Sequence, residues 1–216
     1  MATTTTTGFL DTDAVRGIDV SHFQGQINWA QVAAAGIQFC YVKATDGIAF
    51  SDVRFQANFG GSKAAGLRTG AYHFLRAGSD AEKQAESFLH LVPTLDQGDL
   101  PPALDIEIAD GTSGNAILDA AQVWLEAVEN VLQRRPLIYT IASFWNSTLA
   151  GSTRFEDYFL WIADYGARTA PRLPTGRTTY EIWQFSQTGS VPGIAGNVDL
   201  DRFGGSLEDL NALASG

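Results

Sequence analysis

Two acidic residues in the stretch 100–110, Asp105 and Glu107, have the types and the spacing that acid–base chemistry needs. They alternate with apolar residues, a pattern typical of a β-strand that buries one face. On such a strand both carboxyl groups point to the same side, roughly 7 Å apart. Adjacent carboxylates repel each other, so one should keep its proton to an unusually high pH and act as an acid beside an ionised partner.

The same alternation would arise on the solvent face of an ordinary amphipathic strand, and only geometry separates the two interpretations. The flanks of the stretch favour a site. Pro101 and Pro102 suit the beginning of a strand but not the inside of its hydrogen-bonded ladder, and residues 109–114 are typical of a loop. The acids should therefore lie at the carboxyl end of a strand, which carries the chemistry in parallel α/β folds.

Strands and helices are expected to alternate along most of the chain. The predicted strands are 15–20, 37–43, 69–75, one that Pro101-Pro102 begins and the loop from Ala109 ends, 137–141, 159–163, 180–185 and 197–200. The predicted helices are 29–35, 52–65 with a weak point at Gly60-Gly61, 79–91 opening on a Ser79–Glu82 capping box, 115–135, 144–149 and 206–214. Repeated strand–helix units predict a parallel sheet, and eight strands predict its closure into a barrel. Residues 166–179 and 187–196 carry Gly, Pro and Ser without a helical stripe, so helices should follow only about the first five strands.

The 216 residues, 45% of them hydrophobic, can bury the core of one domain. We expect a flexible leader at 1–14 and a barrel over 15–216. No apolar run is long enough for a membrane span, and no secretory signal is visible at the start of the sequence.

The net charge of −10 argues against nucleic acid as a partner. The single Cys40 lies in an apolar run and is expected in the core. Because the three histidines and Cys40 are not at ligand spacing, no metal site is expected, and no cofactor is predicted.

Two further acids should join the pair at the mouth of the barrel. Asp19 ends the first predicted strand and Asp199 lies in the eighth, and these strands become neighbours when a barrel closes. A mouth with four acids and aromatic side chains, without a convincing Ser–His or Cys–His pair, is typical of a site that cleaves glycosidic bonds.

The chain resembles the glycoside hydrolase family 25 lysozymes, the Chalaropsis-type muramidases, from about Gly17 to Phe203. The resemblance rests on an ordered set of short motifs, each of them weak alone. They are Gly17-Ile18-Asp19-Val20-Ser21, Gln24-Gly25 with Asn28-Trp29, Val42-Lys43-Ala44-Thr45-Asp46-Gly47, Gly70-Ala71-Tyr72-His73-Phe74, Leu104-Asp105-Ile106-Glu107, Leu160-Trp161-Ile162-Ala163, Trp183-Gln184 and Val198-Asp199-Leu200.

This resemblance implies an irregular TIM-like (β/α)5(β)3 barrel and cleavage of the β-1,4 bond from N-acetylmuramic acid to N-acetylglucosamine in peptidoglycan, with retention. Glu107 matches the general acid. Asp105 would either orient the substrate's N-acetyl group for attack or attack directly. Asp19 and Asp199 match the remaining carboxylates, expected to keep Glu107 protonated and to hold the hydrogen bonds of the pocket.

The aromatic residues divide into two groups. Tyr72, Tyr139 and Trp161 end strands whose matching family positions line the sugar site, and Gln184 is assigned there too; aromatic rings suit the apolar faces of sugars. Three other tryptophans and two histidines are expected to be structural: Trp29, Trp124, Trp145, His22 and His73. His73 should face the opposite side of its strand from its two neighbours.

Peptidoglycan is thus the expected partner of a monomeric enzyme that acts on the cell wall, outside the cell. Two other classes stay open at this point. One is a carbohydrate-binding protein that has lost activity, and the other is a divalent-metal hydrolase that uses the acidic mouth.

Overall fold

The computed structural model describes residues 14–166 and 169–215. The leader predicted for residues 1–14 therefore lies, except for Ala14, outside the described residues. The strands are β1 (Arg16–Val20), β2 (Phe39–Asp46), β3 (Phe50–Ser51), β4 (Arg68–Phe74), β5 (Ala103–Asp105), β6 (Leu137–Ile141), β7 (Phe159–Ala163), β8 (Ile182–Gly189) and β9 (Val198–Phe203). The helices are the 3-10 turn η1 (His22–Gln24), α1 (Trp29–Ala34), α2 (Phe55–Ala64), α3 (Ala81–Leu91), α4 (Gly114–Leu132), α5 (Ala142–Thr148) and α6 (Leu207–Leu213).

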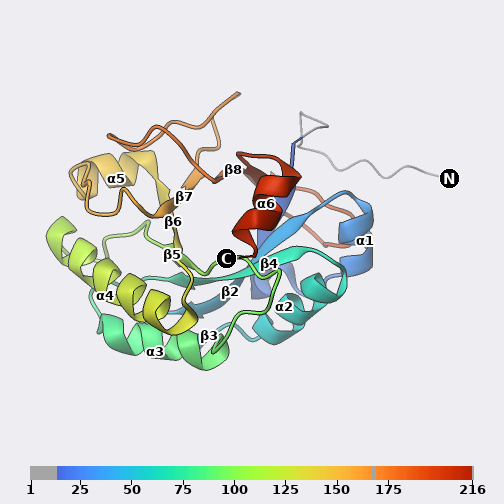
Figure 1. Cartoon of the computed structure of the whole chain (residues 1–216), viewed down its shortest axis with the longest axis horizontal. Coiled ribbons are helices and arrows are strands. Elements are labelled where there is room, and N and C mark those ends of the chain that lie inside the picture. The colour runs from blue at the N-terminus through green and yellow to red at the C-terminus, as the bar shows by residue number, and fades with distance from the viewer. Residues whose placement is uncertain (1–13, 167–168, 216) are drawn as a thin grey trace.

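Eight strands close into a barrel, which confirms the predicted α/β barrel in a single domain (Figure 1). The order around the sheet is β1-β9-β8-β7-β6-β5-β4-β2, and the pairing of β1 with β2 closes the ring. The short strand β3, which was not predicted, pairs only with β2, as the far arm of an antiparallel hairpin.

The barrel is mixed, so the expectation of an all-parallel sheet was wrong for one strand. β9 runs antiparallel to both of its neighbours, β8 and β1. The connection from β8 to β9 is short and contains no helix, and a connection of that kind can only reverse the chain, whereas a parallel pair needs a longer crossover.

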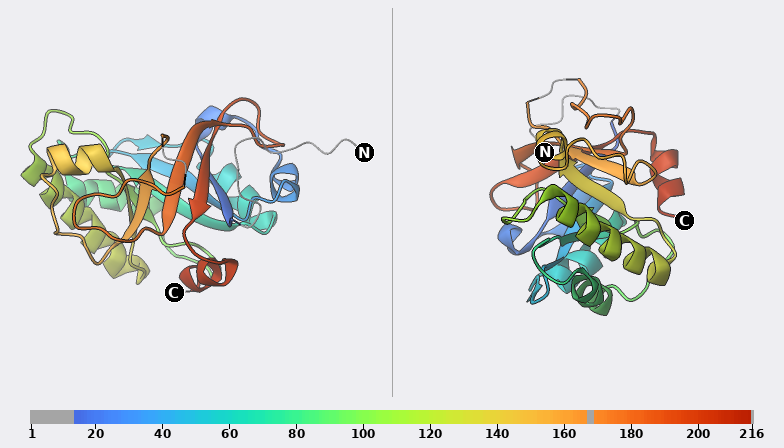
Figure 2. Two further views of the ribbon diagram at one scale, coloured as in Figure 1. Left: turned by 90° about the horizontal axis from the view of Figure 1, so that it is seen from above. Right: turned by 90° about the vertical axis from the view of Figure 1, so that its left-hand side faces the viewer.

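Helices cover the part of the barrel formed by the earlier strands, and loops cover β8 and β9 (Figure 2). Asn28, Ser113 and Ser206 cap α1, α4 and α6 with their side chains. Asp80, not Ser79, caps α3 by accepting a hydrogen bond from the Lys83 backbone, because the helix begins one residue later than the predicted capping box implies.

The pair Gly60-Gly61 does not weaken α2, which is continuous through it. A Cβ atom at position 61 would lie 2.4 Å from the Trp29 ring, so the glycine lets α1 pack closely against α2. A glycine also makes room for a large ring inside the barrel, where a Cβ atom at Gly70 would lie 2.4 Å from the Tyr41 ring. Large side chains thus fill the barrel below its carboxyl end, and the remaining space is confined to that end.

Strand β5 is much shorter than predicted. It ends at Asp105, so Glu107 follows the strand instead of lying on it. The Thr140 hydroxyl donates to the Ile106 carbonyl at 2.7 Å, and the Ile106 amide donates to the Tyr139 carbonyl, so a side chain replaces the next rung of the β5–β6 ladder. The prediction that Asp105 lies at the carboxyl end of its strand is confirmed.

Among the described residues, no helix has the length and apolar character needed to cross a membrane.

Candidate active site

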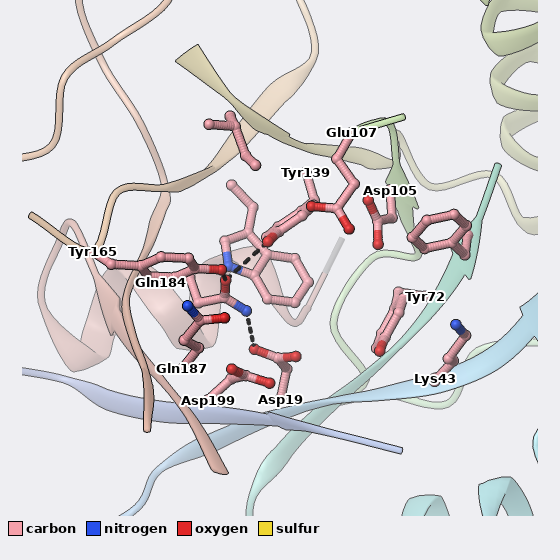
Figure 3. Close-up of a pocket in the computed structure, with 13 residues that line it drawn as sticks. Asp19, Lys43, Tyr72, Asp105, Glu107, Tyr139, Tyr165, Gln184, Gln187 and Asp199 are labelled. Atoms are coloured by element: carbon pink, nitrogen blue, oxygen red, sulfur yellow. Dashed lines mark hydrogen bonds between the residues drawn. The ribbon is translucent and has the colours of Figure 1, made fainter. Parts of the chain in front are cut away.

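A pocket of about 380 Å³ opens at the carboxyl end of the barrel, and all eight predicted site residues line it (Figure 3). These residues are Asp19, Tyr72, Asp105, Glu107, Tyr139, Trp161, Gln184 and Asp199. Five further residues complete the lining: Lys43, Phe74, Ile141, Tyr165 and Gln187. Strands far apart in the sequence therefore bring the predicted side chains into one cavity.

Asp105 and Glu107 lie next to each other on one side of the pocket (Figure 3). Asp105 is only 7% exposed, and its Oδ1 atom is buried without a hydrogen-bond partner among the described residues. Burial and then the charge of Glu107 raise the pKa of Asp105 well above its usual value, and Lys43 opposes that rise. Burial also raises the pKa of the half-buried Glu107, again opposed by Lys43. Both carboxyl groups thus stay protonated to a higher pH than exposed acids do, and the shift is larger for Asp105.

Asp19 and Asp199 face this pair from the other side of the pocket (Figure 3). They stand directly opposite each other in the antiparallel pairing of β1 with β9, which confirms that the first and last strands bring them together. Burial, followed by the charge of Asp199, raises the pKa of Asp19 well above its usual value. The pKa of Asp199 is raised to about 6, by burial first and then by the charge of Glu107.

Gln184 connects the tyrosines of the pocket to the acids. Its Oε1 atom accepts hydrogen bonds from the hydroxyls of Tyr139 at 2.9 Å and Tyr165 at 2.7 Å. Its Nε2 atom donates to Asp19 at 2.6 Å. The amide side chain is 4% exposed, so its polar atoms serve these neighbours and fix the direction in which each of them points.

An aromatic cluster forms the floor of the pocket around Trp161. Its ring centroid lies 4.9 Å from that of Tyr139 and 6.2 Å from that of Tyr72, both edge-on, and 4.8 Å from that of Tyr41 below. The indole Nε1 donates to Asp201 at 2.9 Å. These contacts hold Trp161 rigidly beneath the acids.

The sequence analysis did not assign six residues of the site, namely Lys43, Phe74, Ile141, Tyr165, Gln187 and Asp201, and three of them matter most for its chemistry. Asp201 is fully buried and lies within hydrogen-bonding contact of Asp19. Its signal was present, because it lies two residues after Asp199 on the same strand and must share its face. Lys43 stands in a motif that was noted but not interpreted, and Tyr165 follows β7 in a stretch without any pattern.

The residues predicted to be structural lie outside the pocket. His73 points outward, stacks on Trp124 at 5.3 Å between centroids and contacts Thr45 and Gln84 through its ring nitrogens. His22 contacts Asp52. Cys40 and the three tryptophans assigned to the core are buried, namely Trp29, Trp124 and Trp145. No cluster of three or more histidine, cysteine or acidic residues suited to a metal ion occurs within 14–166 and 169–215.

Comparisons with known proteins agree with this geometry. The profile of the family described as "Glycosyl hydrolases family 25" matches residues 18–194. Lysozyme M1 of Streptomyces globisporus is 39% identical over 225 residues, which cover 97% of this chain and 74% of that protein. The N,O-diacetylmuramidase of Chalaropsis sp is 29% identical over 215 residues, covering 94% of this chain and 100% of that protein.

Solved structures give the same result. The bacterial lysozyme from Streptomyces coelicolor superposes with a TM-score of 0.89 at 38% identity, covering 95% of this chain and 99% of that one. A family GH25 lysozyme from Aspergillus fumigatus superposes with a TM-score of 0.85 at 31% identity, covering 94% and 100% of the two chains. The chain therefore belongs to glycosyl hydrolase family 25, a family of lysozymes and muramidases that hydrolyse peptidoglycan.

Proposed function

We propose that this protein is a muramidase that cleaves the β-1,4 bond from N-acetylmuramic acid to N-acetylglucosamine with retention of configuration. The observation that carries the proposal is the pair Asp105 and Glu107, buried and half-buried in one pocket with two more carboxylates opposite. Glycoside hydrolysis requires two acidic groups beside the bond that is cleaved.

Glu107 is the general acid in this mechanism. Burial raises its pKa, so its protonated form persists to a higher pH than that of an exposed glutamic acid. It is less buried than Asp105 and stands beyond the end of β5, where it can reach the oxygen of the bond to be cleaved. Donating its proton there lets the leaving sugar depart as a neutral alcohol.

Asp105 orients the substrate's N-acetyl group, whose carbonyl oxygen attacks the anomeric carbon. The buried Oδ1 atom of Asp105 has no partner among the described residues, and an unsatisfied acceptor in a low-dielectric pocket binds a donor such as an acetamido N–H strongly. In its ionised form, which Lys43 favours, Asp105 also stabilises the positive charge of the ring that the attack forms. The alternative, direct attack by Asp105, would give a covalent glycosyl-enzyme.

The remaining pocket residues bind and hold the sugar. Tyr72, Tyr139 and Trp161 offer aromatic surface, while Asp19 and Asp199 offer hydrogen-bond acceptors to hydroxyl groups. Gln184 acts mainly through Tyr139 and Asp19, because both ends of its amide are already engaged. We expect a monomer that acts outside the cell, where its substrate lies.

The test is product analysis after digestion of purified peptidoglycan. Mass spectrometry should find muramic acid at the new reducing ends, and the activity should survive EDTA. Glucosamine at the reducing ends would make the protein a glucosaminidase. Absence of cleavage would support a sugar-binding protein, and loss of activity in EDTA would support a metal hydrolase.

The route through Asp105 has its own test. If the N-acetyl group is the nucleophile, peptidoglycan from which these groups have been removed should bind but be cut poorly. No sugar should become attached to the protein. A mass increase on the peptide that contains residues 104–108 would instead assign the attack to Asp105 and would leave the muramidase proposal standing.

A further inference from the structure

Four exposed apolar side chains gather beside the pocket, where η1 follows β1 and the β2–β3 hairpin begins. Phe23 is 81% exposed, Val53 84%, Ile48 41% and Phe50 40%. The other large exposed hydrophobic residues of the described chain lie apart in sequence: Val123, Val131, Tyr165 and Leu207. We call Phe23, Ile48, Phe50 and Val53 the aromatic rim, because its two phenylalanines present the largest surface.

The aromatic rim is held rigidly from behind by His22 and Asp52. The buried Asp52 carboxylate accepts from the His22 backbone amide at 2.9 Å and contacts its ring Nδ1 at 2.8 Å. The His22 ring in turn lies 4.1 Å from the Phe23 ring and 5.6 Å from the Phe50 ring, between centroids. Both exposed rings thus contact His22, whose position Asp52 fixes, and this contact lowers part of the entropy cost of binding a ligand.

The aromatic rim is continuous with the pocket through Lys43 and Phe74. The Lys43 ammonium group lies 5.9 Å from the centre of the Phe50 ring and 4.8 Å from that of Phe74. Both Lys43 and Phe74 also line the pocket. An unbroken path of side chains therefore leads from Asp105 and Glu107 to Phe23 at the surface.

We propose that the aromatic rim binds sugars of the glycan strand that extend beyond the pocket. The proposal rests on the proposed function, because it assigns the long polymer that a muramidase would cleave. A pocket of about 380 Å³ lies near the lower end of the range for a small ligand and cannot enclose a polymer. The strand must leave the pocket across its edge, and this edge offers rigid rings.

The chemistry of the aromatic rim favours sugar faces over charged groups. The apolar face of a pyranose ring gains from stacking on an aromatic ring, as amphipathic ligands do. Asp52, behind the rim, is buried against His22 and does not face the ligand, and Asp46, opposite Phe50 in the β2–β3 pairing, is ion-paired with Lys43 and Arg76. The occupant is therefore the glycan backbone, bound through the apolar faces of its sugar rings, and the stem peptide of peptidoglycan is the competing occupant.

The experiment measures the binding of peptide-free glycan strands, prepared as a disaccharide and a dodecasaccharide, to the Glu107→Gln protein, which should cleave them far more slowly than the wild type. Adding Phe23→Ala and Phe50→Ala should raise the Kd of the dodecasaccharide about tenfold, which is equivalent to about 1.4 kcal/mol of lost binding free energy. Affinity for the disaccharide should stay within about twofold, because that ligand is short enough to bind in the pocket alone. Phe23→Trp should preserve the affinity, since it keeps an exposed ring at that position.

Matched valines provide the control. Val53→Ala should weaken binding of the long strand slightly, whereas Val131→Ala, an equally simple change on the exposed side of α4, should not. Equal affinity of the parent protein for both lengths, or an unchanged dodecasaccharide Kd in the double variant, would overturn the proposal. So would a loss confined to strands that carry stem peptides. Failure of the muramidase proposal shows separately, in the reducing ends that the wild-type protein produces.

Discussion

Asp105 and Glu107 on the β5 side of the pocket differ from Asp19 and Asp201 on the β1–β9 side in the neighbours that surround them. The β5 pair has a cation, Lys43, that lowers the pKa of both groups, and Asp105 keeps one acceptor atom for which the described part of the chain offers no donor. The β1–β9 pair has neutral donors instead, Gln184 on Asp19 and the Trp161 indole on Asp201.

The difference in neighbours distinguishes the acids that act on the substrate from the acids that hold the pocket in shape. An acid that must give up a proton or receive a substrate group needs unused hydrogen-bonding capacity, which the β5 side has. On the other side, Asp19 accepts from Gln184 and Asp201 accepts through Oδ1 from the Trp161 indole, while Oδ2 of Asp201 is buried without a donor among the described residues. Asp19 and Asp201 lie in hydrogen-bonding contact that two ionised carboxylates cannot use, because neither would hold a proton to donate. We infer that this pair shares a proton.

The largest effect should come from the β5 side. Glu107→Gln removes the proton that the leaving oxygen needs, so kcat should fall by at least about a hundredfold, the usual scale for a positioned general acid. Melting temperature and KM should change little. Glu86→Gln, at an exposed position on α3, is the matched control and should retain full activity. Near-normal turnover by the Glu107 variant would refute the assignment.

Asp105→Asn should have the second-largest effect, lowering kcat by roughly tenfold to a hundredfold. The amide keeps one acceptor oxygen but loses the charge that stabilises the ring formed by N-acetyl attack. Asp19→Asn provides the comparison across the pocket. Its kcat should fall less, because Gln184 can still donate to the remaining oxygen. An equal fall in kcat in the two variants would contradict the division into acids that act on the substrate and acids that hold the pocket in shape.

The sequence predicted the strands and helices best where side-chain periodicity decides them. The bounds of β6 and β7 agree with the prediction, and α4 agrees to within a few residues, because an apolar stripe and a breaker such as Pro136 define such elements locally. The end of β5 was missed because a distant side chain, Thr140, sets it. The direction of β9 was missed because only the length of the preceding connection reveals it.

In the candidate site, too, local patterns were predicted and contacts between distant segments were not. Asp105 and Glu107 were found from their spacing, and Asp19 with Asp199 from the closure of the barrel. Asp201 was not assigned, although its spacing from Asp199 placed it on the same face of the strand; its full burial and its contact with Asp19 depend on the register of β9 against β1, which pairs it with Gly17. The engagement of Gln184 by two tyrosines likewise requires the three-dimensional positions of three separate segments.

Asp201→Asn should change stability more than activity. The raised pKa values of Asp19 and Asp201 mean that the folded state binds protons more tightly, so the free energy of unfolding should fall as pH rises from about 4 through those raised values. The variant removes one buried acid but can still accept from Trp161. At pH 7 its free energy of unfolding should rise by roughly 1 to 3 kcal/mol, and its pH dependence should flatten.

Urea unfolding between pH 4 and pH 8 tests this stability prediction, a range that spans the usual carboxyl pKa and neutrality. Asp157→Asn, at an exposed position, is the control and should leave the curve unchanged. A uniform loss of stability at every pH in the Asp201 variant would mean that Asp201 acts through packing and hydrogen-bond geometry alone.

The smallest expected effect is a shift in the pH profile of the Lys43→Met variant. It tests which side of the pocket determines the pH dependence of the activity. Activity of the wild-type protein should fall as pH rises through the raised pKa of Glu107, because only the protonated form donates. Lys43 lowers the pKa of Glu107 and Asp105 but is not among the causes that set the pKa of Asp199. Removing its charge should therefore move the alkaline limb of kcat/KM to higher pH, while activity on the acid side changes by less than about threefold. Asp46 keeps its ion pair with Arg76 in this variant, and Lys83→Met at an exposed position serves as the control. A limb that stays in place near pH 6 would assign the pH dependence to Asp199 and the β1–β9 side instead.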